Sequence, residues 1–388
     1  FFEEGTGIEV RQGGRLAIEG TPYQRVRLAH VPNGTGQWEG IRFDDSLEDN
    51  RLYCVDMESG DGQGESVDVQ HSRVELDNVT WAGTNTRILN VDHPTVIARD
   101  CVFPSISGAE PIHGVGLTGD ERLVFERCTF GTATGYNDVI DFAGGQRPGP
   151  IVQIYDSVFL GGGDDGPDLD GADAHIEGNV FVHFNRNQGG DSTSNAIATG
   201  RDGDHTTALC LVRNLFVDND HAVLVKEDGF LRAEHNTFVN TGVATISFGE
   251  PDRSPPRPAG RGAYMAGNIF WNNAAMFEHF FDESLPDYGP TDLVVEASIL
   301  PAIWHGLGVG NIDADPLFVS ANDYYLKPMS AAVASGPFGL DMGAYVPGGA
   351  AITGEPSGTT YRTDAILTVG GPGITDYVYS VNSPSGPW

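Results

Sequence analysis

Aspartates gather in two short segments of the sequence, at spacings that would let them share a cation. The segments are NDVIDF (137–142) and DDGPDLD (164–170), which together hold six aspartates. If the segments are adjacent strands, their carboxylates stand about 5 Å apart and repel unless a cation or a proton lies between them. A set of oxygen donors suits Ca²⁺, which takes roughly six to eight oxygen ligands. The sequence therefore predicts a calcium site made by Asp138, Asp141, Asp164, Asp165 and Asp168.

The aspartates recur in register, which separates a cation site from an ordinary acidic surface. In the alignment Asp138 stacks on Asp165, and Asp141 stacks on Asp168. The alternative is that these acids only line the turns of an acidic chain, since 54 Asp and Glu stand against 22 Lys and Arg. Acids in turns need not repeat at matching positions of successive strands. The register therefore favours the metal site.

A lysine two strands further along is the candidate catalytic base. Lys226, in HAVLVKEDG (221–229), aligns with Asp170 at the same outward-facing position, so the two are expected about 10 Å apart. The sequence has only one other lysine, Lys327. A base must be neutral, and the neighbouring acids at 227 and 228 would raise the lysine pKa unless a cation offsets them. The alternative is an ordinary surface lysine paired with one of those acids.

Four further residues are weaker candidates. Arg201 is a second candidate for the base, or would hold a substrate carboxylate, although an arginine in a loop is more often a solvated ion-pair partner. Asn195 stacks beside Asp165 as a substrate or ion ligand, or as a structural amide. His221 and His235 are candidate substrate-binding proton carriers, although isolated histidines on strands are mostly structural.

A repeated pentapeptide predicts the elements that position these residues. Each copy runs from a polar or small residue to an aromatic one, and the gaps between successive aromatic ends are 22, 27, 29, 22, 35, 22 and 32 residues. The apolar–polar alternation is that of strands, and Gly, Asn and Asp clusters separate the copies. A base period of 22 residues predicts an all-β, right-handed parallel β-helix. The copies are DNVTW (77–81), RDCVF (99–103), ERCTF (126–130), YDSVF (155–159), EGNVF (177–181), VRNLF (212–216), EHNTF (234–238) and AGNIF (266–270).

The residue two before each aromatic forms a predicted internal column. In its later half the column is an asparagine ladder at positions 179, 214, 236 and 268, whose stacked amides would satisfy one another. Cys101 and Cys128 fall in neighbouring turns of this column, and we expect buried thiols there rather than a disulfide.

We expect the β-helix to occupy residues 1–350. Within it, residues 313–346 are predicted to cover the last open turn. Residues 351–388 shift to Gly, Thr and Ser and predict a short β segment that begins an appended domain. The ends of the sequence suggest a monomeric unit within a longer, multidomain chain.

The segment GDDGPDLDG (163–171) resembles the DDGxDL motif of polysaccharide lyase family 9, which are calcium-dependent β-helix enzymes that cleave pectate-like uronate polymers by β-elimination. This resemblance covers one turn of the coil. It implies that Asp164, Asp165, Asp168 and, by stacking, Asp141 bind Ca²⁺. In that family the catalytic base is a lysine on the turn after the aspartate pair. The corresponding stretch here is NAIATGR (195–201), which contains no lysine. Lys226, one turn further on, is the replacement we expect.

Composition and the predicted fold limit the range of possible functions. The formal charge of 22 − 54 = −32 excludes binding to nucleic acid through a basic surface. No apolar run approaches a membrane span, so no membrane insertion is expected. The predicted function is that of a secreted or cell-surface bacterial polysaccharide lyase acting on an acidic polysaccharide with Ca²⁺. Two alternatives stay open: a β-helix glycoside hydrolase with paired aspartates, and a non-catalytic carbohydrate-binding module.

Overall fold

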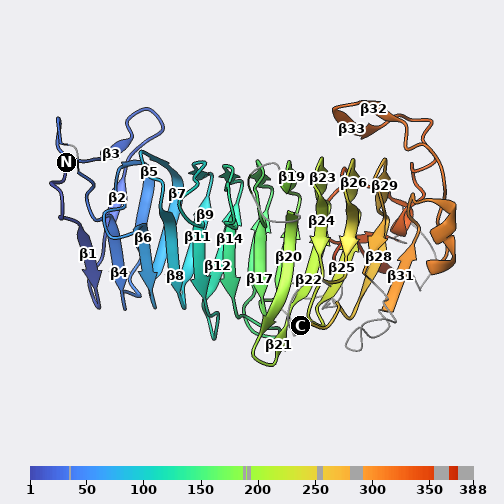
Figure 1. The fold of residues 1–388 in the computed structure, drawn as a ribbon, viewed down its shortest axis with the longest axis horizontal. Helices are drawn as coiled ribbons and strands as arrows, with labels where there is room; N and C mark the ends of the chain where they lie inside the picture. Colours follow the sequence, from blue (N-terminus) through green and yellow to red (C-terminus); the bar gives the residue numbers. More distant parts are fainter. Residues whose placement is uncertain are drawn as a thin grey trace, which may run out of the picture.

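The chain coils into a right-handed parallel β-helix, as the repeats predict (Figure 1). The computed structural model describes residues 1–34, 36–186, 189, 194–250, 257–279, 292–353 and 367–374. Within these ranges nearly all regular structure is β, and strands of successive turns pair in parallel along the whole solenoid.

One sheet carries the candidate site. Its 12 strands among the described residues stack in chain order, with β21 (His205–Thr206) paired to the end of β20. The others are β1 (Ile8–Arg11), β4 (Ile41–Asp44), β6 (Glu65–Gln70), β8 (Arg87–Asp92), β11 (Ile112–Val115), β14 (Ile140–Ala143), β17 (Pro167–Asp170), β20 (Asn195–Asp202), β24 (His221–Leu224), β27 (Ala244–Ser247) and β30 (Phe277–Glu278).

The second sheet has 19 strands in the part of the chain that the structure describes, because most turns contribute two short strands joined at a corner. These are β2 (Ala17–Glu19), β3 (Val26–Leu28), β5 (Asn50–Glu58), β7 (Arg73–Ala82), β9 (Thr95–Arg99), β10 (Val102–Phe103), β12 (Arg122–Glu126), β13 (Thr129–Phe130), β15 (Val152–Tyr155), β16 (Val158–Phe159), β18 (Ala174–Glu177), β19 (Val180–Val182), β22 (Ala208–Val212), β23 (Leu215–Val217), β25 (Phe230–Glu234), β26 (Thr237–Val239), β28 (Gly262–Ala266), β29 (Ile269–Trp271) and β31 (Asp292–Glu296).

The predicted columns form the core. The aromatic ends of the repeats stack from Trp81 to Phe270, with ring centroids 4.3–5.1 Å apart from one turn to the next. The asparagine ladder is confirmed, since Asn179 Nδ2 donates to Asn214 Oδ1 at 3.1 Å and later amides repeat the contact. Cys101 and Cys128 are free, buried thiols. The repeats thus set the register of the whole coil, because each turn places an aromatic side chain and the column residue two positions before it inside.

The carboxyl-terminal segment packs on both the last turn and the flank of the coil. The last turn is packed by the 3₁₀ helix η2 (Ala302–Leu307), whose Trp304 meets Phe277 edge-on at 5.2 Å. Residues of the segment 313–346 also pack there, since Ala332 and Met342 cluster with Ile299 of the last turn. The segment continues along the flank of the 19-stranded sheet, where Tyr324 and Ala344 pack on β23 and β26. This segment includes β32 (Phe318–Ser320), β33 (Asp323–Leu326) and η3 (Pro337–Gly339) (Figure 1).

Past residue 350, β34 (Ala351–Thr353) pairs with β35 (Thr368–Gly370). The N–H of Gly373 donates to Glu234 Oε2 at 2.7 Å, so this described part also touches the flank. The division at residue 350 stays a prediction. Among the described residues, no helix has the length and apolar character needed to cross a membrane.

Candidate functional site

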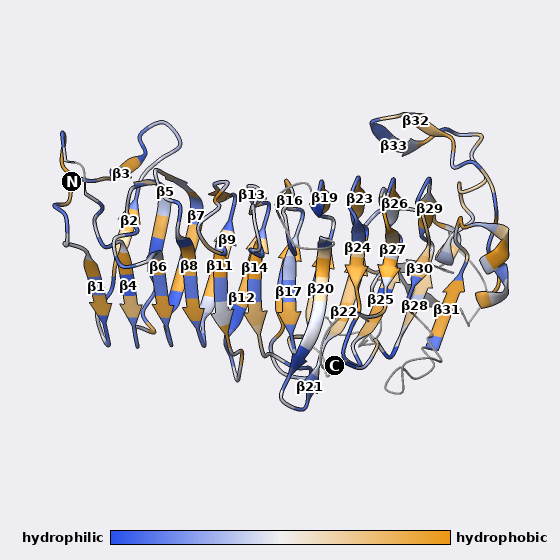
Figure 2. Cartoon of the chain, viewed as in Figure 1, coloured by the Kyte–Doolittle hydropathy of each residue, from blue (hydrophilic) through white to orange (hydrophobic). Residues whose placement is uncertain are grey.

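The candidate site lies on the outer face of the 12-stranded sheet, where one side chain from each strand forms a column along the solenoid. Strand pairing places Asp141 beside Asp168, and Asp168 beside Ala198, as the sequence alignment predicts. Figure 2 shows the polar character of the middle of β6 to β17 and the apolar character of β24 and β27. In axial order the column reads Asp68, Asn90, His113, Asp141, Asp168, Ala198, Leu224 and Ser247.

Hydrogen bonds join the early members of the column. Asp68 Oδ1 accepts from Asn90 Nδ2 at 3.0 Å and from Gln70 Nε2 at 2.6 Å, while its Oδ2 accepts from Arg42 at 2.7 Å. His113 Nδ1 lies 3.3 Å from Asn90 Oδ1. The result is a continuous polar strip that leads along the sheet to the aspartates.

A polar group that the sequence analysis missed stands one strand before the aspartate motif. Glu110, His113 and Asp141 offer one ligand atom each, all within 4.8 Å of one another. His113 Nε2 lies 3.7 Å from Asp141 Oδ2. Burial, with Glu110 and Asp168 adding to it, raises the pKa of Asp141 to about 7. Asp141 is therefore grouped with two residues outside the predicted set. Aligning IHGV (112–115) with the next strand would have placed His113 beside Asp141.

The inner part of the site is formed by three of the predicted aspartates. Carboxylate oxygens of Asp138, Asp164 and Asp165 all lie within 4.8 Å of one another. Asp165 is buried; its backbone N–H donates to Asp138 Oδ1 at 3.0 Å, and Asn195 Nδ2 donates to its Oδ1 at 2.6 Å. Burial and then the neighbouring carboxylates raise the pKa of both Asp138 and Asp165. One cation between these oxygens removes the repulsion, so the donor set fits Ca²⁺.

Asp168 adds an independent observation in favour of a cation. Its Oδ1 is buried and has no hydrogen-bond partner within the described structure. A buried carboxylate oxygen without a partner is costly, and buried polar atoms normally have one. Asp168 also raises the pKa of Asp170 to about 6, after the effect of burial. A place among the ligands of a divalent ion satisfies the orphaned oxygen.

Lys226 lies inside the site and not on the surface. Its side chain is 8% exposed, and its Nζ lies 3.5 Å from Glu250 Oε2. Burial alone would lower the lysine pKa, but Asp168, Asp165 and Glu250 outweigh it and raise the pKa. The alternative of a surface lysine paired with its sequence neighbours is wrong, because Glu227 pairs with Arg257, and Asp228 pairs elsewhere.

A glycine connects Asp170 with Lys226 across the strand between them. Strand pairing puts Gly200 beside Asp170. A Cβ atom at Gly200 would stand 1.6 Å from Asp170 Oδ1, so the carboxylate occupies the place of the missing side chain. Asp170 thereby leans toward the next strand, and its charge helps to raise the pKa of Lys226.

Three weaker candidates take other roles. Arg201 is exposed at the end of β20 and pairs with Asp228, as a solvated ion pair does. His221 is buried behind Asn195; its Nδ1 lies 2.8 Å from Asn195 Oδ1, and its Nε2 lies 2.6 Å from Glu278 Oε1. It therefore supports Asn195, which in turn holds Asp165.

His235 corrects a prediction, because it is placed away from the site. It lies at a corner of the 19-stranded sheet, fully buried under the carboxyl-terminal segment, with Nδ1 2.9 Å from the carbonyl oxygen of Asp341. His235 directly precedes Asn236 of the asparagine ladder, and the chain turns at this residue. The side chain of His235 therefore faces the flank of the 19-stranded sheet. A substrate at the aspartates is out of its reach.

Comparisons with known proteins concern the fold. The sequence matches no protein-family model and no curated protein. A solved structure of pectate lyase Pel9A is similar, with 14% identity over 89% of this chain and 88% of that chain, and a TM-score of 0.40. A variant catalytic domain of a GH87 α-1,3-glucanase in complex with nigerose has 13% identity over 74% of this chain and 61% of that chain, with a TM-score of 0.35. No residue role follows from likenesses this distant.

Proposed function

We propose that the chain is a calcium-dependent polysaccharide lyase that cleaves a uronic-acid polymer by β-elimination. The observation that carries the proposal is the convergence of opposite charges on one face. Asp165 of the carboxylate cluster, and Asp168 with its unpartnered buried oxygen, both lie within electrostatic reach of the buried Lys226. A hard cation fits the carboxylates, and Lys226, once it has lost its proton, would be the proton acceptor beside them.

Elimination makes specific demands on such a site. The proton on C5 of a uronate is very weakly acidic, so the carboxylate next to it must be neutralised and a base must stand over C5. When bound, Ca²⁺ supplies that neutralisation. Asp138, Asp164, Asp165 and Asp168 would hold the ion, and Asn195 keeps Asp165 in position.

Lys226 must lose its proton to act as the base. The carboxylates around it raise its pKa, so it is an ammonium ion in the calcium-free protein. Two of these carboxylates, Asp165 and Asp168, are proposed ligands of a divalent ion, whose charge would favour the neutral amine. The neutral Nζ of Lys226 would take the proton from C5. The electron pair of that C–H bond would form the C4–C5 double bond as the bond from C4 to the glycosidic oxygen breaks, and that oxygen would take a proton from solvent as it leaves.

The acidity of the protein is an obstacle to an anionic polymer. A net charge of −32 repels such a substrate at long range. Salt screens that repulsion, and a bound divalent ion would offset part of the negative charge of the cluster. An acidic polysaccharide outside the cell, at high ionic strength, is the partner that these conditions suit.

A substrate panel tests the proposal. The protein is incubated with pectic, alginate, glucuronan and sulfated algal polymers, with Ca²⁺ or with chelator. A lyase produces the ultraviolet absorbance of unsaturated uronides with at least one polymer, and chelator removes it. New reducing ends without that absorbance would show hydrolysis, and no products with any acidic polymer would contradict enzymatic function.

A glycoside hydrolase is the second candidate, on one observation. Asp141 has a pKa raised to about 7 and stands beside Asp168 on the next strand. A protonated carboxyl next to a second carboxylate is the arrangement that hydrolysis uses. The product analysis above separates the two reactions.

A further inference from the structure

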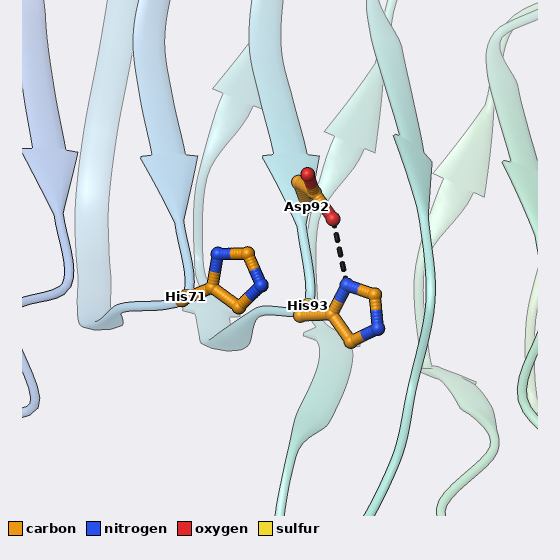
Figure 3. A group of neighbouring side chains, drawn as sticks. All are labelled: His71, Asp92 and His93. Carbon is orange, nitrogen blue, oxygen red and sulfur yellow. Dashed lines mark hydrogen bonds and ion pairs between the residues drawn. The ribbon is translucent and has the colours of Figure 1, made fainter.

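A second cluster of metal-binding side chains lies away from the aspartates, at the corner where β6 and β8 end (Figure 3). It consists of His71, Asp92 and His93, which offer one ligand atom each, all within 4.8 Å of one another. His71 follows the last residue of β6, while Asp92 ends β8 and His93 follows it. The proposed function uses none of the three.

Backbone hydrogen bonds hold the two histidines one turn apart. The N–H of His71 donates to the carbonyl of Asp92 at 2.8 Å, and the N–H of His93 donates to that of Val115 at 3.0 Å. Both histidines have left-handed backbones, with φ of +45° and +49°. In the next turns glycine takes this position, as at Gly116 with φ of +77°. Histidine is thus used twice in succession where glycine is the easier choice.

The two histidine rings have nitrogen atoms that can donate an electron pair to a metal ion. His93 Nδ1 lies 2.7 Å from Asp92 Oδ1, and because a carboxylate only accepts, Nδ1 carries the proton. That leaves Nε2 as the free donor atom, in the carboxylate–histidine arrangement that supports bound metals. The two imidazole rings are stacked, with centroids 5.0 Å apart and planes 8° from parallel. His71 is exposed, so its ring is free to turn and direct a nitrogen at an ion shared with His93.

We propose that His71 and His93, with Asp92 holding the His93 ring in place, form a site for a divalent transition-metal ion of the Zn²⁺ class. Imidazole nitrogen favours such ions over Ca²⁺, which prefers oxygen. The ion would link the ends of two successive strands in the amino-terminal half of the coil. Solvent fills the remaining coordination positions, because the side chains of Asp92 and His93 are each 36% exposed.

Calorimetric titration of the full chain with Zn²⁺, in the presence of excess Ca²⁺, tests this site. The wild type is expected to bind zinc, and His71→Ala and His93→Ala are each expected to weaken binding at least tenfold. His205→Ala, which removes an exposed histidine of the β20–β21 hairpin, should leave binding unchanged. X-ray absorption at the zinc edge of the wild type should show imidazole scattering from two rings, a result that does not depend on the variants folding.

Three results would overturn the proposal. They are zinc affinity unchanged in both alanine variants, a zinc shell made of oxygen alone, and zinc binding lost in His113→Ala but kept in His93→Ala. The last would assign the ion to the group with Glu110 and Asp141. Zinc binding is measured without a polysaccharide, so it stands or falls independently of the lyase proposal.

Discussion

The outer face of the 12-stranded sheet has two different halves, and the proposed catalytic site lies where they meet. In β14 and β17 buried residues alternate with partly exposed ones, so the outer face is open. In β24 and β27 every residue is buried, so both faces are covered. The change begins within β20, whose first six residues are buried and whose last two are exposed.

This contrast explains how opposite charges come to share one place. On the open side the strands present partly exposed aspartates, among them Asp141 and Asp168. On the covered side Lys226 is buried, and residues 257–260 pair with the chain at 226–228. At the boundary Ala198 and Gly200 are too small to fill the outer face, so the carboxylates and the ammonium ion face each other across them.

Removing the lysine should have the largest effect. Lys226→Met keeps the length of the side chain but has neither proton acceptor nor charge, so turnover should fall about 10²–10⁴-fold. Substrate depletion and unsaturated product are measured at saturating Ca²⁺. Lys327→Met, at an exposed position, is the matched control and should retain wild-type turnover. Full activity in Lys226→Met would remove the lysine from the mechanism.

The second-largest effect is expected from removing the charge of Asp168, whose buried Oδ1 has no hydrogen-bond partner within the described structure. Asp168→Asn keeps the shape of the side chain and removes its charge, so calcium affinity should fall roughly 10–100-fold. Isothermal titration with Ca²⁺ measures the change. Asp120→Asn, a substitution of an exposed aspartate on another loop, serves as the control. Equal affinity in Asp168→Asn and wild type would place the ion elsewhere.

A smaller effect is expected at the glycine between the two charges. Gly200→Ala places a methyl group where Asp170 now leans, so the carboxylate must move away from Lys226. Because that carboxylate is the end of a short side chain, we expect a stability loss of only about 1 kcal/mol and a few-fold loss of activity. Gly306→Ala, at a position with open space, is the control for urea unfolding. A cost no larger than that of the control would show that the contact is unimportant.

The smallest predicted effect is on the pH dependence of stability in chelator. Asp141 has a pKa raised to about 7, above that of an unfolded aspartate, so the folded chain holds this proton more tightly. Its stabilising contribution is complete below the unfolded pKa and is lost as pH rises through about 7. Between roughly pH 5 and 8 the thermal midpoint of the wild type should therefore fall more steeply than that of Asp141→Asn. Parallel curves for the two proteins would contradict the shift.

Features that depend on the register between successive turns could be predicted from the sequence. Repeat spacing predicted the β-helix, the asparagine ladder and the stacking of Asp141 on Asp168, because one slipped residue would turn every core side chain outward. A role for Glu110 and His113 was not predicted, because both residues belong to the preceding turn of the coil, outside the aspartate motif. The burial of Lys226 depends on contacts with Glu250 and residues 257–260, which no local pattern in the sequence indicates.

The most direct test of the account is the anomalous scattering of crystals grown with Ca²⁺. The account predicts one strong peak between the carboxylates of Asp138, Asp164, Asp165 and Asp168, with Nζ of Lys226 still facing it. Crystals saturated with Ca²⁺ that show no peak among these side chains would contradict it.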